Sequence, residues 1–150
     1  DLYWTLQGVG ECALDLDYSG FDSSISKSML EWAAHLIMRV TKINKPGLWD
    51  YIINPQRVFK KWVYETDGGL PSGCPCTSIL DTIINTAVIL EACLRADPDV
   101  GLHKLWDMNR FVCYGDDVLL ASSASSELSA ELLVEVASEF GMIMTAARKC

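Results

Sequence analysis

The stretch that decides the fold reads F-V-C-Y-G-D-D-V-L-L-A and runs from Phe111 to Ala121. Two apolar runs of strand length flank Tyr114-Gly115-Asp116-Asp117, so the pattern predicts a β-hairpin with carboxylates at its tip. Adjacent carboxylates repel one another, and loss of surrounding water increases that cost. A divalent cation such as Mg²⁺ removes the cost. Taken alone, the tetrapeptide also fits an ordinary turn, because Asp and Gly are common turn residues.

Outward from this hairpin, the residue pattern alternates between strand and helix periods, which predicts the order β-α-(β)-α-β-β-α. The fold class is therefore α+β, an antiparallel sheet of about three or four strands with helices packed on one face. The remaining predicted elements are a strand at Cys12–Asp17, a helix from Ser24 to Val40, a strand at Trp62–Tyr64, a largely buried helix at Ser78–Arg95, and a last helix capped by Ser126 and ended by Gly141.

Composition limits the alternatives. A length of 150 residues with 50% hydrophobic residues predicts one domain with its own core. The longest apolar candidate, near Ile79–Leu94, is interrupted by polar residues, so no membrane span is expected. The six cysteines lack zinc-site spacing and are expected to be reduced thiols. The chain begins without Met and is interpreted as a fragment. A net charge of −8 argues against phosphate binding by this surface alone.

Four segments in a fixed order carry a family resemblance. Asp17–Asp22 (D-Y-S-G-F-D), Gly69–Thr77 (G-L-P-S-G-C-P-C-T) and Tyr114–Asp117 (Y-G-D-D) resemble motifs A, B and C in the palm of positive-strand viral RNA polymerases. The likeness is closest to the picornavirus-like group. Gly141–Lys149 looks like the end of motif D in that family. The resemblance implies that residues 1–150 are a single partial domain, a polymerase palm that carries motifs A to D.

The resemblance implies template-directed RNA synthesis, in which an RNA 3′-hydroxyl attacks an NTP and releases pyrophosphate. Asp17 and Asp116 would then be the principal metal ligands, with Asp117 assisting. They would hold two Mg²⁺ ions, for which Mn²⁺ is a possible substitute. Lys149 would be the general acid that protonates the departing pyrophosphate.

The resemblance also implies a nucleotide-binding set. Asp22 would accept a hydrogen bond from the ribose 2′-hydroxyl, and Ser72, Gly73 and Thr77 would shape the nucleotide-binding loop. Asp81 stands where the family usually has an Asn that helps to read the ribose. Either Asp81 is protonated or has a different hydrogen-bond partner, or sugar recognition differs in detail. Asn85, one helical turn further, could contribute instead.

The expected partners are RNA template and primer, NTPs, the fingers and thumb of the same polypeptide, and other viral replication proteins. The fingers and thumb are absent from this chain, and their absence would account for its acidic balance. We do not expect 150 residues to polymerise RNA alone. The expected location is the host cytoplasm, in membrane-associated replication complexes.

Three alternatives stay open at this stage. A reverse transcriptase palm also places an aspartate pair on a hairpin, but Asp22 at the ribose position favours ribonucleotides. Asp15-x-Asp17-x-Ser19-Gly20 fits the start of a calcium-binding EF-hand loop, yet position 12 would be Ser26 in place of the bidentate Glu. A purely structural or interaction role leaves the four acids of the motifs unexplained as a set.

Overall fold

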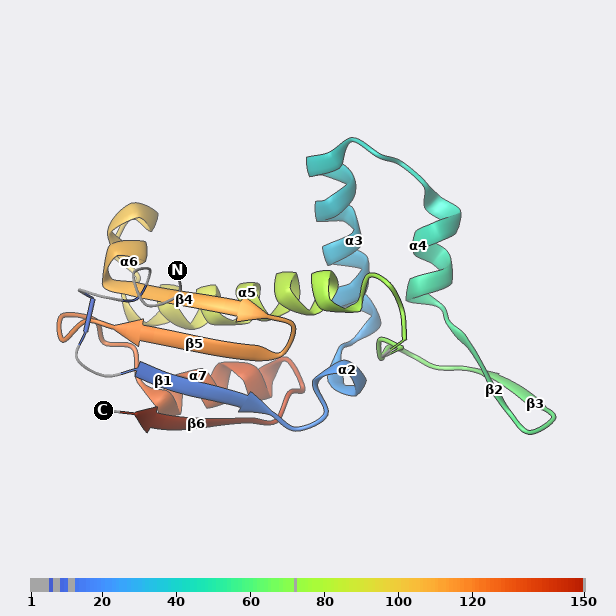
Figure 1. The fold of residues 1–150 in the computed structure, drawn as a ribbon. Helices are drawn as coiled ribbons and strands as arrows, with labels where there is room; N and C mark the ends of the chain where they lie inside the picture. The colour runs from blue at the N-terminus through green and yellow to red at the C-terminus, as the bar shows by residue number, and fades with distance from the viewer. Residues whose placement is uncertain (1–5, 7–8, 11–12, 72, 150) are drawn as a thin grey trace.

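The computed structural model describes residues 6, 9–10, 13–71 and 73–149. Figure 1 shows one sheet with helices behind it, and a helical and hairpin extension at the opposite side. The elements, in chain order, are β1 (Ala13–Tyr18), α2 (Phe21–Ser24), α3 (Lys27–Thr41), α4 (Pro46–Ile53), β2 (Gln56–Phe59), β3 (Trp62–Glu65), α5 (Thr77–Ala96), α6 (Leu102–Met108), β4 (Asn109–Tyr114), β5 (Asp117–Ser122), α7 (Ala130–Glu139) and β6 (Met144–Lys149).

The main sheet has four strands in the order β4-β5-β1-β6, and every neighbouring pair is antiparallel. This confirms the predicted fold class. β1 lies in the interior of the sheet, where Ala13 pairs with Ala121 of β5 and with Lys149 of β6. The fourth strand, β6, was not predicted, because its sequence lacks the alternation of apolar and polar residues that marks a half-buried strand.

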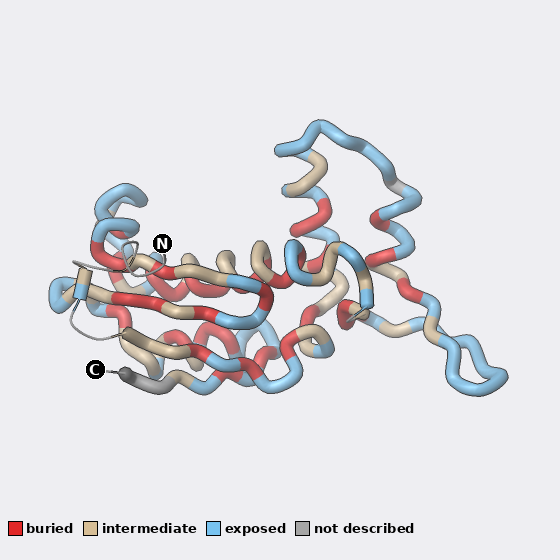
Figure 2. Tube along the Cα trace, in the orientation of Figure 1, coloured by how far each residue is buried: buried red, intermediate tan, exposed pale blue. Residues whose placement is uncertain are grey.

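Helices α5 and α7 cover one face of this sheet; α5 packs on β4 and α7 on β6. The core between the layers contains Leu16 and Leu120 from the strands, and Ile84 and Val88 from α5, all at most 2% exposed. Figure 2 shows this buried layer in red along the sheet and α5. Alternate residues of β1 therefore point into the core, and the others point to the open face.

By length and composition α5 could cross a membrane, and it is the one such helix in the described part of the chain. A single helix of this kind is weak evidence of a membrane span. Core helices pass the same test, and α5 buries Leu80, Ile84, Val88 and Ile89 in the core. Packing accounts for its apolar sequence.

The helix starts give two corrections. The helix predicted from Ser24 begins at Lys27, because Ile25 is extended and Ser26 forms the cap. The cap of α7 is Ser129, whose Oγ accepts from the Leu132 amide at 3.1 Å. Ser126, the predicted cap, donates instead to Asp97.

Gly141 ends α7 as predicted. Its φ is +79°, and the next amide, Met142, donates to the carbonyl of Ala137 at 3.0 Å. This is the glycine-terminated Schellman arrangement of a helix end.

Three helices and one strand outside the main sheet were also missed: α2, α4, α6 and β2. Pro46-Gly47 and Asn54-Pro55 are typical turn dipeptides, yet the residues from Pro46 to Ile53 form α4, since Pro is well suited to a first helical turn. The short helix α6 and the strand β2 gave no periodic signal. The predicted strand at Trp62–Tyr64 exists as β3, but it pairs with β2 in a separate hairpin that projects from the body (Figure 1).

A glycine pair fixes the loop before α5 against α2. Gly68 has φ +96°, and a Cβ there would meet the Ile25 carbonyl oxygen at 2.7 Å. The Gly69 amide donates to that same carbonyl, and the Leu70 amide donates to the Asp22 carbonyl. Backbone contact this close requires a residue without a side chain.

Gly68→Ala is expected to lower the free energy of unfolding by about 2 kcal/mol, because it adds both a positive-φ penalty and a clash with backbone. Gly47→Ala is the matched control, since a Cβ at Gly47 meets nothing within 4 Å. Urea unfolding of the two variants measures the difference. Equal stability of the variants would contradict the tight packing of this loop on α2.

Candidate active site

The sheet topology brings three of the predicted acids to one end. Leu16 pairs with Val118, so the same register continued by one residue places Asp17 opposite Asp117. Asp116 occupies the adjoining β4–β5 turn. Leu16 and Tyr18 are buried toward the helices, whereas Asp17, Asp116 and Asp117 are exposed. Two parts of the chain that are far apart in sequence therefore place these three acids at the same end of the sheet.

The turn that carries Asp116 is held from below by α5. The Gly115 amide donates to Thr82 Oγ1 at 2.9 Å. Asn85 Nδ2 donates to the carbonyls of Gly115 and Asp116 at 3.0 and 3.1 Å. Gly115 has φ +65° at the first turn position, where glycine is favoured.

The same side-chain amide is tied to β1. The Tyr18 hydroxyl donates to Asn85 Oδ1 at 2.9 Å. Burial, with a smaller contribution from Cys113, raises the pKa of Tyr18, so its hydroxyl stays protonated and available as a donor. Asn85 is 0% exposed, and both ends of its amide are engaged in this network. It therefore links motif A to motif C and is not available to a ribose, which was the role considered for it from sequence.

Thr82 and Asn85 are site residues that the sequence reasoning missed in this role. The available signal was a polar residue at two consecutive turns of an otherwise apolar helix. Buried amides need hydrogen-bond partners, and the neighbouring turn is the one element of the described chain that offers Asn85 backbone carbonyls. Which partner it would find depends on tertiary packing that the sequence alone does not specify.

Asp22 and Asp81 form a carboxyl pair. Asp81 is 3% exposed, lies close enough to Asp22 for the two carboxyl groups to interact, and has a buried Oδ1 without a hydrogen-bond partner among the described residues. Burial first, then the charge of and hydrogen bond to Asp22, and then the charge of Asp116, raise the pKa of Asp81 to about 7. Two carboxyl groups that share a hydrogen bond need a proton between them. The raised pKa favours a protonated Asp81, which was one of the alternatives left open, and the role of Asp81 at the ribose stays a prediction.

The nucleotide-loop residues are placed as follows. The Thr77 hydroxyl lies within hydrogen-bond distance of the carbonyls of Pro71 and Cys74, at 2.9 and 2.8 Å, so it closes the loop at the start of α5. Gly73 is exposed and lines a cavity of about 440 Å³ together with Arg57. Ser72 lies outside the described residues.

The backbone of Lys149 lies away from the acids. It pairs with Ala13, whereas the residue that pairs with Asp17 is Thr145. Four residues of strand separate the two positions, which corresponds to about 13 Å. Catalysis by Lys149 stays a prediction, and it requires a rearrangement of β6 that brings this residue toward Asp17.

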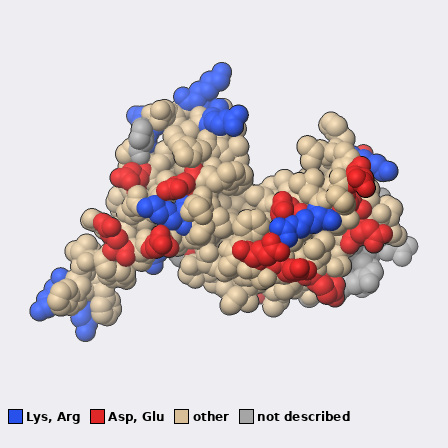
Figure 3. Space-filling model, turned by 180° about the vertical axis from the view of Figure 1, so that it is seen from behind, with Lys and Arg blue, Asp and Glu red and all other residues tan. Residues whose placement is uncertain are grey.

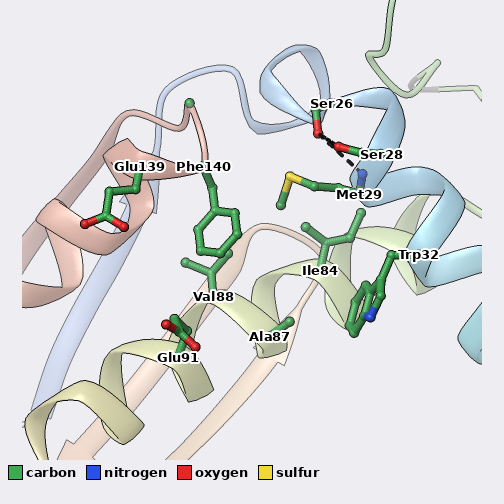
Figure 4. Close-up of a pocket in the computed structure, with 11 residues that line it drawn as sticks. Ser26, Ser28, Met29, Trp32, Ile84, Ala87, Val88, Glu91, Glu139 and Phe140 are labelled. Atoms are coloured by element: carbon green, nitrogen blue, oxygen red, sulfur yellow. Dashed lines mark hydrogen bonds between the residues drawn. The ribbon is translucent and has the colours of Figure 1, made fainter.

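A hollow on the helical layer is a different feature. It is an apolar groove of about 690 Å³ between α3, α5 and the end of α7, lined by Met29, Trp32, Ile84 and Val88 (Figure 4). None of the predicted site residues lines it. The acids of the site lie at the end of the sheet instead.

The sequence profile of the family described as viral RNA-dependent RNA polymerase matches residues 1–150. The chain belongs to this polymerase family. It is 33% identical over 153 residues to the genome polyprotein of human rhinovirus A serotype 89, and 30% identical over 151 residues to that of poliovirus type 3. Each alignment covers 99% of this chain and 7% of the polyprotein. The resemblance found from the motifs is confirmed.

The family implies a divalent metal, so the acids must be tested for fit. Carboxylate oxygens are the ligands that Mg²⁺ prefers, and the register gathers them at one sheet end. Among the described residues, no three His, Cys, Asp or Glu side chains lie close enough to hold an ion as they stand. The chemistry and topology fit, and the side chains would have to turn toward a shared ion. An EF-hand does not fit, because strand β1 leads into Ser19-Gly20.

Asn85→Asp is expected to lower the free energy of unfolding by about 3 kcal/mol, because it removes two donors and buries a charge beside two carbonyls. Chemical denaturation measures the change. Asn44→Asp makes the same substitution at an exposed position and is the control. Equal effects at the two positions would show that the Asn85 network contributes nothing to stability.

Asp81→Asn is expected to flatten the dependence of stability on pH. Asp81 holds its proton in the fold up to about pH 7 but loses it near 3.9 when unfolded, so its contribution is full below about pH 4 and is lost as pH rises through 7. Asn keeps a donor toward Asp22 at every pH. In metal-free buffer at pH 8, the variant should be more stable than the wild type by about 2 kcal/mol.

Urea unfolding at pH 4 and pH 8 measures this effect, with Asp99→Asn at an exposed position as the control. An unchanged pH dependence in Asp81→Asn would contradict a protonated pair.

Proposed function

We propose that this chain is the catalytic palm of a viral RNA-dependent RNA polymerase that adds nucleotides from NTPs to an RNA 3′-hydroxyl. One observation carries the proposal: the register that places Asp17 opposite Asp117, next to Asp116 in the hairpin turn. Family membership supports the same reaction. Because the chain spans about 7% of its polyprotein relatives, the activity belongs to the whole polymerase, including the fingers and thumb.

In this proposal Asp17 and Asp116 hold two Mg²⁺ ions, with Asp117 assisting and Mn²⁺ as a substitute. Such ions stabilise the attacking and leaving oxygens of an in-line phosphoryl displacement. The protein residues fix the geometry. Asn85 and Thr82 hold the turn that carries Asp116. The hydrogen bond from the Tyr18 hydroxyl to Asn85 connects that turn to β1. A fixed arrangement of charges avoids reorganisation during the reaction.

Ribose selection follows from the carboxyl pair. Asp22 is partly exposed beside the loop that contains Gly73 and Thr77, and Asp81 holds it from the buried side. An oriented Asp22 would accept a hydrogen bond from a 2′-hydroxyl. A deoxyribose would lack this hydrogen bond, at a cost of about 1–3 kcal/mol. This observation favours ribonucleotides over the deoxyribonucleotides of a reverse transcriptase.

The proposed partners are an RNA template and primer, NTPs, and the other parts of the same polypeptide. Other viral replication proteins belong to the same proposal. The relatives are viral genome polyproteins, which supports a place in the host cell. Location in membrane-associated complexes of the host cytoplasm is proposed with them.

Asp116→Ala in the full-length polymerase is expected to reduce primer extension by about 10³-fold or more, because it removes a principal metal ligand. Asp107→Ala, beside the opposite end of β4, is the control and should extend primers normally. Extension on an RNA primer–template with each NTP, and in parallel with each dNTP, measures the rates. Undiminished extension by Asp116→Ala would refute the site, and preference for dNTPs would refute the ribose assignment.

A further inference from the structure

The β2–β3 hairpin has two different faces. Phe59 pairs with Trp62, and Arg57 pairs with Tyr64, so these four side chains share one face. Val58 pairs with Val63 on the other face. Phe59 is 62% exposed and Trp62 68%, as are the two valines at 70% and 62%. One face thus presents aromatic rings to solvent, and the other presents only aliphatic groups beside Gln56 and Glu65.

The aromatic face is also the basic one. The Lys60 ammonium lies 5.5 Å from the centroid of the Phe59 ring, and the Lys61 ammonium lies 5.9 Å from that of Trp62. From Gln56 to Tyr64 the hairpin contains no acid, although the chain as a whole has a charge of −8. Figure 3 shows blue atoms at this projecting tip, with the nearest red atoms toward its base.

The turn conformation is unusual for the residue that occupies it. Lys60 has φ +55°, which glycine or asparagine adopts more easily. The turn thereby places a cation beside the exposed ring of Phe59.

The base of the hairpin is anchored to the predicted nucleotide loop. Arg57 Nη2 donates to the Gly69 carbonyl at 3.4 Å, so this arginine faces the protein. Arg57 also lines the cavity that Gly73 lines. A ligand held on the aromatic face would therefore lie on an element joined directly to motif B.

We propose that this face binds single-stranded RNA, with unpaired bases stacked on Phe59 and Trp62 and phosphates held by Lys60 and Lys61. Exposed aromatic rings alternating with cations are the combination that recognises unpaired bases and their backbone. A purely apolar partner would gain nothing from ammonium groups over the rings. The proposal rests on the proposed function, and it identifies where the template strand touches the protein outside the metal site.

The test uses the full-length polymerase and a fluorescein-labelled oligouridylate, which has little structure of its own. Phe59→Leu/Trp62→Leu keeps apolar bulk and removes both rings; it should weaken binding by about tenfold or more. Lys60→Gln/Lys61→Gln should weaken binding and lower the slope of log affinity against log salt by about 0.7 for each phosphate that the variant no longer neutralises. Val58→Ala/Val63→Ala alters the opposite face and should bind RNA normally. Fluorescence anisotropy measures affinity, and thermal unfolding is followed on every variant.

Unchanged RNA affinity in Phe59→Leu/Trp62→Leu would overturn the inference. The inference would also be overturned if Phe59→Leu/Trp62→Leu and Val58→Ala/Val63→Ala lowered thermal stability and RNA affinity equally. The hairpin would then be a packing surface for the rest of the polypeptide. Asp116→Ala separates this inference from the catalytic proposal: it should bind the oligouridylate normally and fail to extend a primer. If Asp116→Ala extends normally while Phe59→Leu/Trp62→Leu binds RNA weakly, the catalytic assignment fails and the RNA surface stands.

Discussion

The amide of Asn85 is the contact on which the geometry of the site depends. It is fully buried, it donates to the carbonyls of Gly115 and Asp116, and it accepts from the Tyr18 hydroxyl. A buried amide without these partners would cost about 1–3 kcal/mol for each unpaired group, so the network holds together or fails as a unit. One side chain on α5 thereby fixes the end of β1 relative to the acidic turn.

The parts of the fold that were predicted from sequence are those with a local cause. The β4–β5 hairpin has a two-residue turn between apolar runs, and Gly141 ends α7 through a conformation that suits glycine. The parts that were missed have a nonlocal cause. β6 is a strand because β1 offers it a free edge, and its own sequence, Met144–Lys149, shows no strand pattern. The cap of α7 is Ser129 and not the predicted Ser126, because Ser126 donates its hydrogen bond to Asp97, which is far away in sequence.

The features of the site also divide into those that the sequence predicts and those that depend on tertiary packing. Spacing within the motifs was sufficient to select Asp17 and Asp116 as the predicted ligands, because family motifs record which residues recur at which interval. It was not sufficient to find that Asn85 ties the two together, or that Asp81 is buried close to Asp22 and has a raised pKa. These contacts depend on how α5 is rotated against the sheet. The backbone position of Lys149 opposite Ala13 depends likewise on strand register, which its own sequence does not determine.

The different surroundings of the acids explain how a site with so many negative charges can be stable. Asp81 is buried, where water cannot screen its charge, and its raised pKa means that a proton offsets the repulsion from Asp22 and Asp116. Asp17, Asp116 and Asp117 are exposed, so solvent and, in the proposed function, bound magnesium offset theirs. Repulsion is thus relieved by a proton on the buried side and by solvent on the open side, where the proposed cation would act. In the proposed function, an incoming triphosphate would meet the open side only, next to the turn that Asn85 and Thr82 hold.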